Sequence, residues 1–214
     1  MINRTTIAAV AVSAALLYAM PAFAADSSYF SAKGGIFLPN GRDGADYKGF
    51  KFFDTGYSLD LAAGYRPEPY VAFEIGTGFY TTSGKETRAS RVVDRTAYGV
   101  PVTLTAKGIL DFEKIVLSGG AGIGYYFGLI NSTLNDQTTP ANNVSESNHG
   151  AALGYQVVAD ADFKISERWT AGAGFKWFSA RPEIELTDPT TLSRTKQKWE
   201  FGGMVMSLGL KYSF

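Results

Sequence analysis

Apolar residues alternate with polar or small residues along most of the chain, in segments of about ten residues each. In residues 71–80, Val71, Phe73 and Ile75 fall on one face of an extended strand, and Glu74 falls on the other. A period of two residues is that of a β-strand, whose successive side chains point to opposite faces. The sequence therefore predicts an all-β protein. The predicted strands span residues 29–38, 57–65, 71–80, 99–108, 115–127, 152–163, 169–179 and 200–214.

The charged residues of these strands are predicted to share one face, and the opposite face is predicted to carry none. A charge that faces lipid near the middle of a bilayer costs about 2–4 kcal/mol. A soluble barrel would instead place its charges outside and its apolar side chains inside. We therefore interpret the uncharged face as facing lipid and the charged face as facing the lumen. The predicted lumen charges are Lys33, Asp60, Glu74, Lys107, Asp160, Asp162, Lys176 and Lys211.

The connections between the predicted strands alternate between short and long. Strands of about ten residues are long enough to cross a bilayer at a tilt near 45°. Tight turns on one side and long polar loops on the other are typical of outer-membrane barrels. The sequence thus predicts an eight-stranded antiparallel up-and-down transmembrane β-barrel. The short connections are 66–70, 109–114 and 164–168, and the long ones are 39–56, 81–98, 128–151 and 180–199.

The N-terminus has the pattern of an export signal. A short basic start that contains Arg4 precedes an apolar run over residues 7–19, and Ala22 and Ala24 form a small-x-small cleavage site. We expect residues 1–24 to be removed and residues 25–214 to form the barrel. This removal leaves 19 basic and 20 acidic residues, a balance that gives no reason for nucleic-acid binding. The chain has no cysteine, which excludes disulfides, a cysteine nucleophile and thiolate metal sites.

The last strand resembles the C-terminal barrel-assembly signal of Gram-negative outer-membrane proteins. The resemblance rests on the alternation of Leu208, Leu210 and Tyr212 and on the terminal Phe214. It implies that these four residues are read by the barrel-assembly machinery. The mature chain as a whole resembles small barrels of the OmpA transmembrane-domain, OmpX and OmpW type. That resemblance implies an outer-membrane location and contact with the lipid bilayer and lipopolysaccharide. Similar strand-and-turn segments are 32–35, 100–104 and 162–169.

The lumen charges leave two interpretations open. Lys33 and Lys211 are expected on neighbouring strands, with Asp60 and Glu74 on the next two. These residues form either an ion-pair network that plugs the lumen, because buried charges persist when paired, or a polar constriction that gates a narrow passage. Small inward residues favour some open space, and large inward aromatic residues would fill the loop side. The small residues are Ser118, Gly120, Gly122, Gly124, Gly172 and Gly174, and the aromatic ones are Tyr80, Tyr126 and Phe178.

The resemblance allows two functions. OmpW-like barrels imply passage of small apolar solutes through or out of a narrow barrel. OmpX-like and OmpA-like barrels imply a structural or adhesive surface barrel with a plugged lumen, whose loops meet extracellular ligands. We expect no enzyme, because the lone His149 has no oriented partner set and Ala151 stands where a lipid-A deacylase of the His-x-Ser type would need serine. We also expect no metal site and no cofactor.

Overall fold

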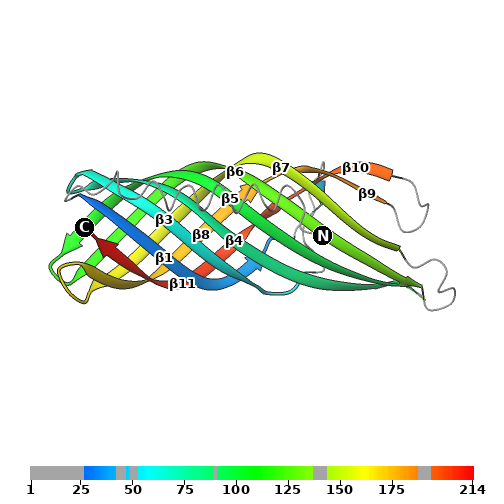
Figure 1. Cartoon of the computed structure of the whole chain (residues 1–214), viewed down its shortest axis with the longest axis horizontal. Helices are drawn as coiled ribbons and strands as arrows, with labels where there is room; N and C mark the ends of the chain where they lie inside the picture. Colours follow the sequence, from blue (N-terminus) through cyan, green and yellow to red (C-terminus); the bar gives the residue numbers. More distant parts are fainter. Residues whose placement is uncertain (1–26, 42–46, 49–52, 89–90, 137–143, 188–193) are drawn as a thin grey trace.

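The barrel wall is built from eight strands that run between its two ends (Figure 1). The computed structural model describes residues 27–41, 47–48, 53–88, 91–136, 144–187 and 194–214. In this part of the chain, eight strands close in the order β1-β11-β8-β7-β6-β5-β4-β3. All eight predicted strands are therefore confirmed. Their bounds are β1 Ser28–Pro39, β3 Gly56–Glu68, β4 Val71–Arg88, β5 Arg91–Phe112, β6 Ile115–Asp136, β7 Val144–Lys164, β8 Trp169–Ala180 and β11 Phe201–Ser213.

The barrel closes where the first strand meets the last. β1 pairs antiparallel with β11 from Tyr29↔Ser213 to Pro39↔Gly203. On its other edge β1 pairs with β3, where Lys33 lies opposite Asp60. Every strand of the wall thus has two hydrogen-bonded neighbours, as a barrel requires where lipid cannot satisfy backbone groups. The predicted up-and-down antiparallel topology is confirmed.

The tight turns lie at one end of the barrel, together with the C-terminus (Figure 1). β3 and β4 are separated by Pro69 and Tyr70, and β5 and β6 by Glu113 and Lys114. Glu113 has a φ of 31°, in the left-handed region that such a tight turn uses. Outward aromatic rings lie in edge-to-face pairs near both ends of the wall, as interfacial girdles do. The ring centroids are 5.0 Å apart for Trp169 and Tyr212, and 5.5 Å apart for Tyr155 and Trp177.

Four strands continue well beyond the predicted ones. Residues 81–98 and much of 128–151 were predicted to be loops, but β4 pairs with β5 out to Arg88↔Arg91, and β6 pairs with β7 out to Leu134↔Val144. These extensions project from the loop end of the barrel (Figure 1). Their composition is as polar as that of a loop, as we expect of strands that extend beyond the bilayer into water. The backbone ladder holds them in extended form without any apolar alternation.

A second, small sheet was not predicted. It joins β2 (Tyr47–Lys48), β9 (Glu183–Thr187) and β10 (Arg194–Trp199) in the order β2-β10-β9. It is formed from the predicted long connections 39–56 and 180–199. No helix in the described ranges is long and apolar enough to cross a membrane.

Glu200 corrects the predicted start of the last strand. It lies within the predicted span 200–214 and has the same parity as Met204, which faces outward. β11 begins only at Phe201, so Glu200 lies outside the regular strand. Its side chain is buried and accepts a hydrogen bond from the Ser179 hydroxyl at 3.1 Å. The uncharged outward face therefore holds along β11, and the predicted start of the strand at residue 200 is what the structure corrects.

Candidate functional site in the barrel interior

The structure places all eight predicted lumen charges inside the barrel. Glu74, Lys107, Asp160, Asp162 and Lys211 are each at most 7% exposed, and the other three are partly buried. Each of the eight has at least one oppositely charged partner within 4.0 Å. Pairing is what permits charges to remain in such an interior, because an unpaired buried charge is strongly unfavourable.

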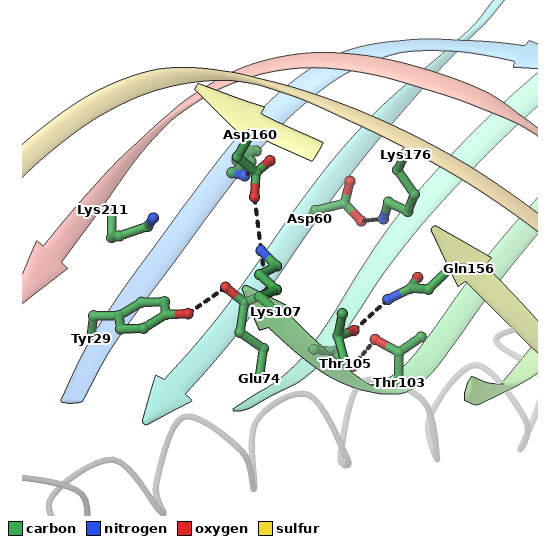
Figure 2. A network of polar contacts seen from close by, with 12 residues as sticks. Tyr29, Asp60, Glu74, Thr103, Thr105, Lys107, Gln156, Asp160, Lys176 and Lys211 are labelled. Atoms are coloured by element: carbon green, nitrogen blue, oxygen red, sulfur yellow. Dashed lines mark hydrogen bonds and ion pairs between the residues drawn. The ribbon is translucent and has the colours of Figure 1, made fainter. Parts of the chain in front are cut away.

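Asp160 on β7 is the centre of this network (Figure 2). It accepts hydrogen bonds from the ammonium groups of Lys33 at 2.5 Å and Lys107 at 2.8 Å. Lys107 also contacts Glu74, with a nitrogen–oxygen distance of 2.7 Å. The Tyr29 hydroxyl donates to the other Glu74 oxygen at 2.7 Å. Two carboxylates and two ammonium groups are thereby joined across four strands.

Two further ion pairs flank this centre. Lys211 donates to Asp162 on the turn side, and Lys176 donates to Asp60. The expected neighbourhood of Lys33 and Lys211 is present in the sheet, but their carboxylate partners are on β7. Residues 127 positions apart, such as Lys33 and Asp160, meet across the lumen. The network therefore spans the interior and does not only follow neighbouring strands.

The glycine positions do not leave the open space that was expected. A Cβ on Gly172 would lie 2.1 Å from an Asp162 carboxylate oxygen, and one on Gly174 would lie 2.8 Å from Asp160. Gly122 likewise faces Thr105 at 2.7 Å. The charged and polar side chains of neighbouring strands thus occupy the space beside these glycines. What remains within the network is a cavity of about 60 Å³, room for a few water molecules.

A polar bridge links the charged half of the interior to the loop-side half. Gln156 donates to the Thr105 hydroxyl at 2.7 Å and accepts from the Tyr126 hydroxyl at 3.3 Å. All three residues are buried. The bridge marks the level at which the lining changes from charged to aromatic.

Aromatic rings fill the loop-side half, as the sequence suggested for Tyr80, Tyr126 and Phe178. The Tyr126 and Phe178 rings stack with centroids 5.5 Å apart and an interplanar angle of 7°. Tyr80 lies 4.9 Å from Phe178 and 5.2 Å from Phe37. We call this group the aromatic half. Its buried members are Phe37, Tyr80, Ala97, Tyr126, Ile130, Phe178, Ala180, Trp199, Phe201 and Val205.

The backbone ladder between β4 and β5 is interrupted beside the aromatic half, although the register is the same on both sides of the interruption. The two strands pair at Thr77↔Val102 and again at Tyr80↔Gly99, with no pairing of the two residues between. Those residues are Gly78 and Phe79 on β4, and Val100 and Pro101 on β5. We call this the wall gap. Proline has no N–H to donate to a ladder, and the Pro101 carbonyl accepts from the Thr77 hydroxyl at 2.9 Å.

The wall gap differs from every other described strand pair of the barrel. The other ladders run without a break, except for a register shift between Tyr65 and Glu68 beside the β3–β4 turn. Within the described wall, the gap therefore lies at the one place where neighbouring strands lose two consecutive pairs. Thr77 and Pro101 also line the small internal cavity.

A polar vestibule opens at the turn end, below the ion pairs. It has a volume of about 460 Å³ and is lined by Arg66, Asp111, Asp162, Lys164 and Lys211 among others. Its inner end is closed by Tyr29, whose ring lies 5.2 Å from the Arg66 guanidinium and 5.1 Å from the Lys211 ammonium. The vestibule therefore ends at the charge network.

Several interior residues were not anticipated from the sequence. Tyr29, Phe37, Gln156 and Phe201 all lie on the inward parity of their strands and are buried. Their parity was a usable signal, because each alternates with outward apolar residues. Trp199 gave no such signal, since it lies in β10, outside the barrel strands.

The residues of the proposed assembly signal lie along the outer face of β11. Leu208 is 72% exposed and Leu210 is 49% exposed to the surroundings. The Tyr212 ring contacts the Phe214 ring edge-on with centroids 5.3 Å apart. Ala22 and Ala24 of the predicted cleavage site lie outside the described residues.

His149 lies on β7 and not in a loop, and its side chain is exposed. Ser145, Ser147 and Ala151 share its parity. In the described part of the chain, no group of three or more His, Cys, Asp or Glu residues is placed to hold a metal ion.

Comparison with known proteins agrees with this architecture. Residues 9–214 match the family model of the outer membrane protein beta-barrel domain. OprG from Pseudomonas aeruginosa has a similar fold, with a TM-score of 0.60 and 15% identity over 88% of this chain and 96% of that one. Neisserial surface protein A has a TM-score of 0.50 and 11% identity over 89% and 98% of the two chains. A major outer membrane protein from Thermus thermophilus also has a TM-score of 0.50, at 10% identity over 88% and 100%. A comparison with curated proteins gives no significant match.

The matched region covers the whole described barrel, and the similar structures share the fold alone at these identities. The chain belongs to the outer membrane protein beta-barrel domain family and is a small eight-stranded barrel of the Gram-negative outer membrane.

Proposed function

We propose that this barrel transfers small apolar solutes from its external mouth into the outer membrane, sideways through the wall gap. The observation that carries the proposal is the position of the gap. It lies beside the aromatic half, and the charge network closes the straight route below it.

The two halves of the interior would treat an apolar solute differently. The aromatic half offers stacked rings. An apolar molecule that contacts these rings buries apolar surface and does not remove water from polar groups of the protein. The half below offers Asp160 with its two lysines, which an apolar molecule cannot solvate. Such a solute is therefore expected to stop above the charge network, near Gln156 and Thr105. Pro101 of the wall gap lies four residues from Thr105 along β5, toward the loop end.

The gap provides the lower-energy exit at that level. Parting two strands elsewhere would break ladder hydrogen bonds in lipid, where each unsatisfied backbone group costs several kcal/mol. Between Thr77 and Tyr80 the pairs are already missing. Phe79 lies on the outer face beside the gap, with its side chain 41% exposed.

A disulfide across the gap tests the proposal. The chain has no native cysteine, so Phe79→Cys with Val100→Cys places one pair at the gap. When oxidised, this variant should reduce entry of the apolar dye N-phenylnaphthylamine to the rate in cells without the barrel, and reductant should restore entry. The matched control is Ile75→Cys with Leu104→Cys, which joins the same two strands on the same face at an intact rung. Dye entry that is equal in both oxidised variants and in the unmodified barrel would contradict lateral transfer.

A second function, a structural or adhesive surface barrel, is favoured by a different observation. The charge network closes the lumen, and β4–β7 project beyond the wall as paired strands that form an external surface. The same experiment separates the two functions. A barrel that lets no dye enter, even without any disulfide, fits the surface role and not transfer.

We also propose that residues 1–24 are removed on export and that the outer strip of β11 is the assembly signal. Leu208, Leu210, Tyr212 and Phe214 form a continuous apolar strip on the outer face of the strand that closes the barrel. Deletion of Phe214 should reduce the amount of heat-modifiable barrel in the outer membrane. Mass spectrometry of the assembled chain should give the mass of a polypeptide that begins at Ala25. Deletion of the exposed Glu167 in the β7–β8 turn is the control. Normal assembly without Phe214 would argue against the signal.

A further inference from the structure

Two buried hydroxyl groups lie in the aromatic half beside the wall gap. Tyr80 and Ser58 face each other across the β3–β4 ladder, and directly opposite residues project on the same face of a sheet. Tyr80 is 4% exposed and Ser58 is 7% exposed. Neither hydroxyl oxygen has a hydrogen-bond partner in the described structure.

The same rung forms the border of the gap. Tyr80 pairs with Gly99, which is the first pair beyond the two missing ones. A Cβ at residue 99 would lie 2.0 Å from the Tyr80 ring, so glycine is what allows the ring to lie over the β5 backbone. The Tyr80 ring thus lies against the inner side of the wall beside the gap.

Burying a hydroxyl without a hydrogen-bond partner destabilises the folded state. A ligand that supplies an oxygen able to donate or accept at this position recovers part of that cost, whereas a pure hydrocarbon recovers none. The surrounding rings favour a flat ligand, because Tyr126 and Phe178 stack almost parallel. Discrimination by a site built with hydrogen-bonding groups is larger than discrimination by an apolar pocket.

We propose that the aromatic half selects small aromatic alcohols, of the chemical class of phenols, over hydrocarbons of the same shape, through Tyr80 and Ser58. The proposal rests on the proposed transfer function and names its substrate class.

Fluorescence of Trp199 tests the selection. The chain has three tryptophans, and Trp169 and Trp177 lie on the outward parity of β8. In a Trp169→Phe, Trp177→Phe background, all tryptophan fluorescence comes from Trp199, which is buried in the aromatic half. The probes are 4-bromophenol and bromobenzene, whose bromine quenches indole fluorescence on contact. The ratio of their two quenching constants is compared between variants, so that partition into detergent cancels.

The ratio in favour of 4-bromophenol should fall by about fivefold in the Tyr80→Phe, Ser58→Ala variant, which corresponds to the usual net value of about one hydrogen bond. The control is Ser118→Ala, because that hydroxyl is also without a partner but lies opposite Asp160 in the charged half. Heat-modifiable migration shows that each variant is folded.

An unchanged ratio in the Tyr80→Phe, Ser58→Ala variant would overturn the proposed selection, and so would an absence of Trp199 quenching by either probe. The dye-entry experiment tests lateral transfer, and its outcome is independent of the quenching experiment. Selective quenching without any effect of the Phe79–Val100 disulfide on entry would leave the binding site in place and remove the lateral transfer.

Discussion

Replacement of Asp160 by alanine should lower the free energy of unfolding by about 3–5 kcal/mol, the usual loss when one partner of a buried ion pair is removed. Asp160 is the carboxylate that Lys33 and Lys107 share. Lys107 keeps Glu74 as a partner in the variant, but Lys33 has no other ion-pair partner among the described residues. The loss is measured by urea unfolding of the barrel in lipid vesicles.

Two variants show whether the loss arises from an uncompensated charge. Asp111→Ala breaks the Lys164–Asp111 pair, which is also close at 2.6 Å but is exposed, and it should change stability by only about 0–1 kcal/mol. Lys33→Met with Asp160→Leu removes a cation and an anion together, and it should be more stable than Asp160→Ala alone. Equal, small losses in Asp160→Ala and Asp111→Ala would mean that water solvates the network and that the lumen is not closed there.

The inward position of these charges was predictable, while their pairing was not. Parity decides which face a residue occupies, and the lipid face tolerates no charge, so Asp160 and Lys33 could be assigned to the lumen from sequence. Which lysine reaches which carboxylate depends on the stagger of strands around the barrel. That stagger brings β1 and β7 into contact across the lumen, and no local pattern records it.

The external part of the fold was less predictable for a related reason. Ser132 and Ser147 belong to paired strands, yet we expect water on both faces of those extensions, so no energetic cause imposes alternation on the sequence. The wall gap had a visible signal. Pro101 within an otherwise regular strand indicates a missing ladder hydrogen bond, although only the register shows that β4, and not β6, loses the pairing.

The orientation of the wall itself yields the second large effect. Leu104 on β5 is 60% exposed and pairs with Ile75 and Ile123. These neighbours are apolar, and the rung lies about midway between the turn and the external girdle. An arginine there would face the hydrocarbon core, so Leu104→Arg should destabilise the folded barrel in vesicles by about 2–4 kcal/mol.

A substitution to arginine on the external extension should leave the free energy of unfolding almost unchanged. Ser147 is exposed on β7, where it pairs with Asn131 beyond the predicted membrane-crossing span of β6, and a surface change of this kind usually stays within about 0.5 kcal/mol. The comparison of Leu104→Arg with Ser147→Arg therefore measures where the bilayer ends along the strands. If both arginines changed the unfolding free energy by the same small amount, Leu104 would face water. The wall would then not be the lipid-facing surface into which a solute leaving through the gap must pass.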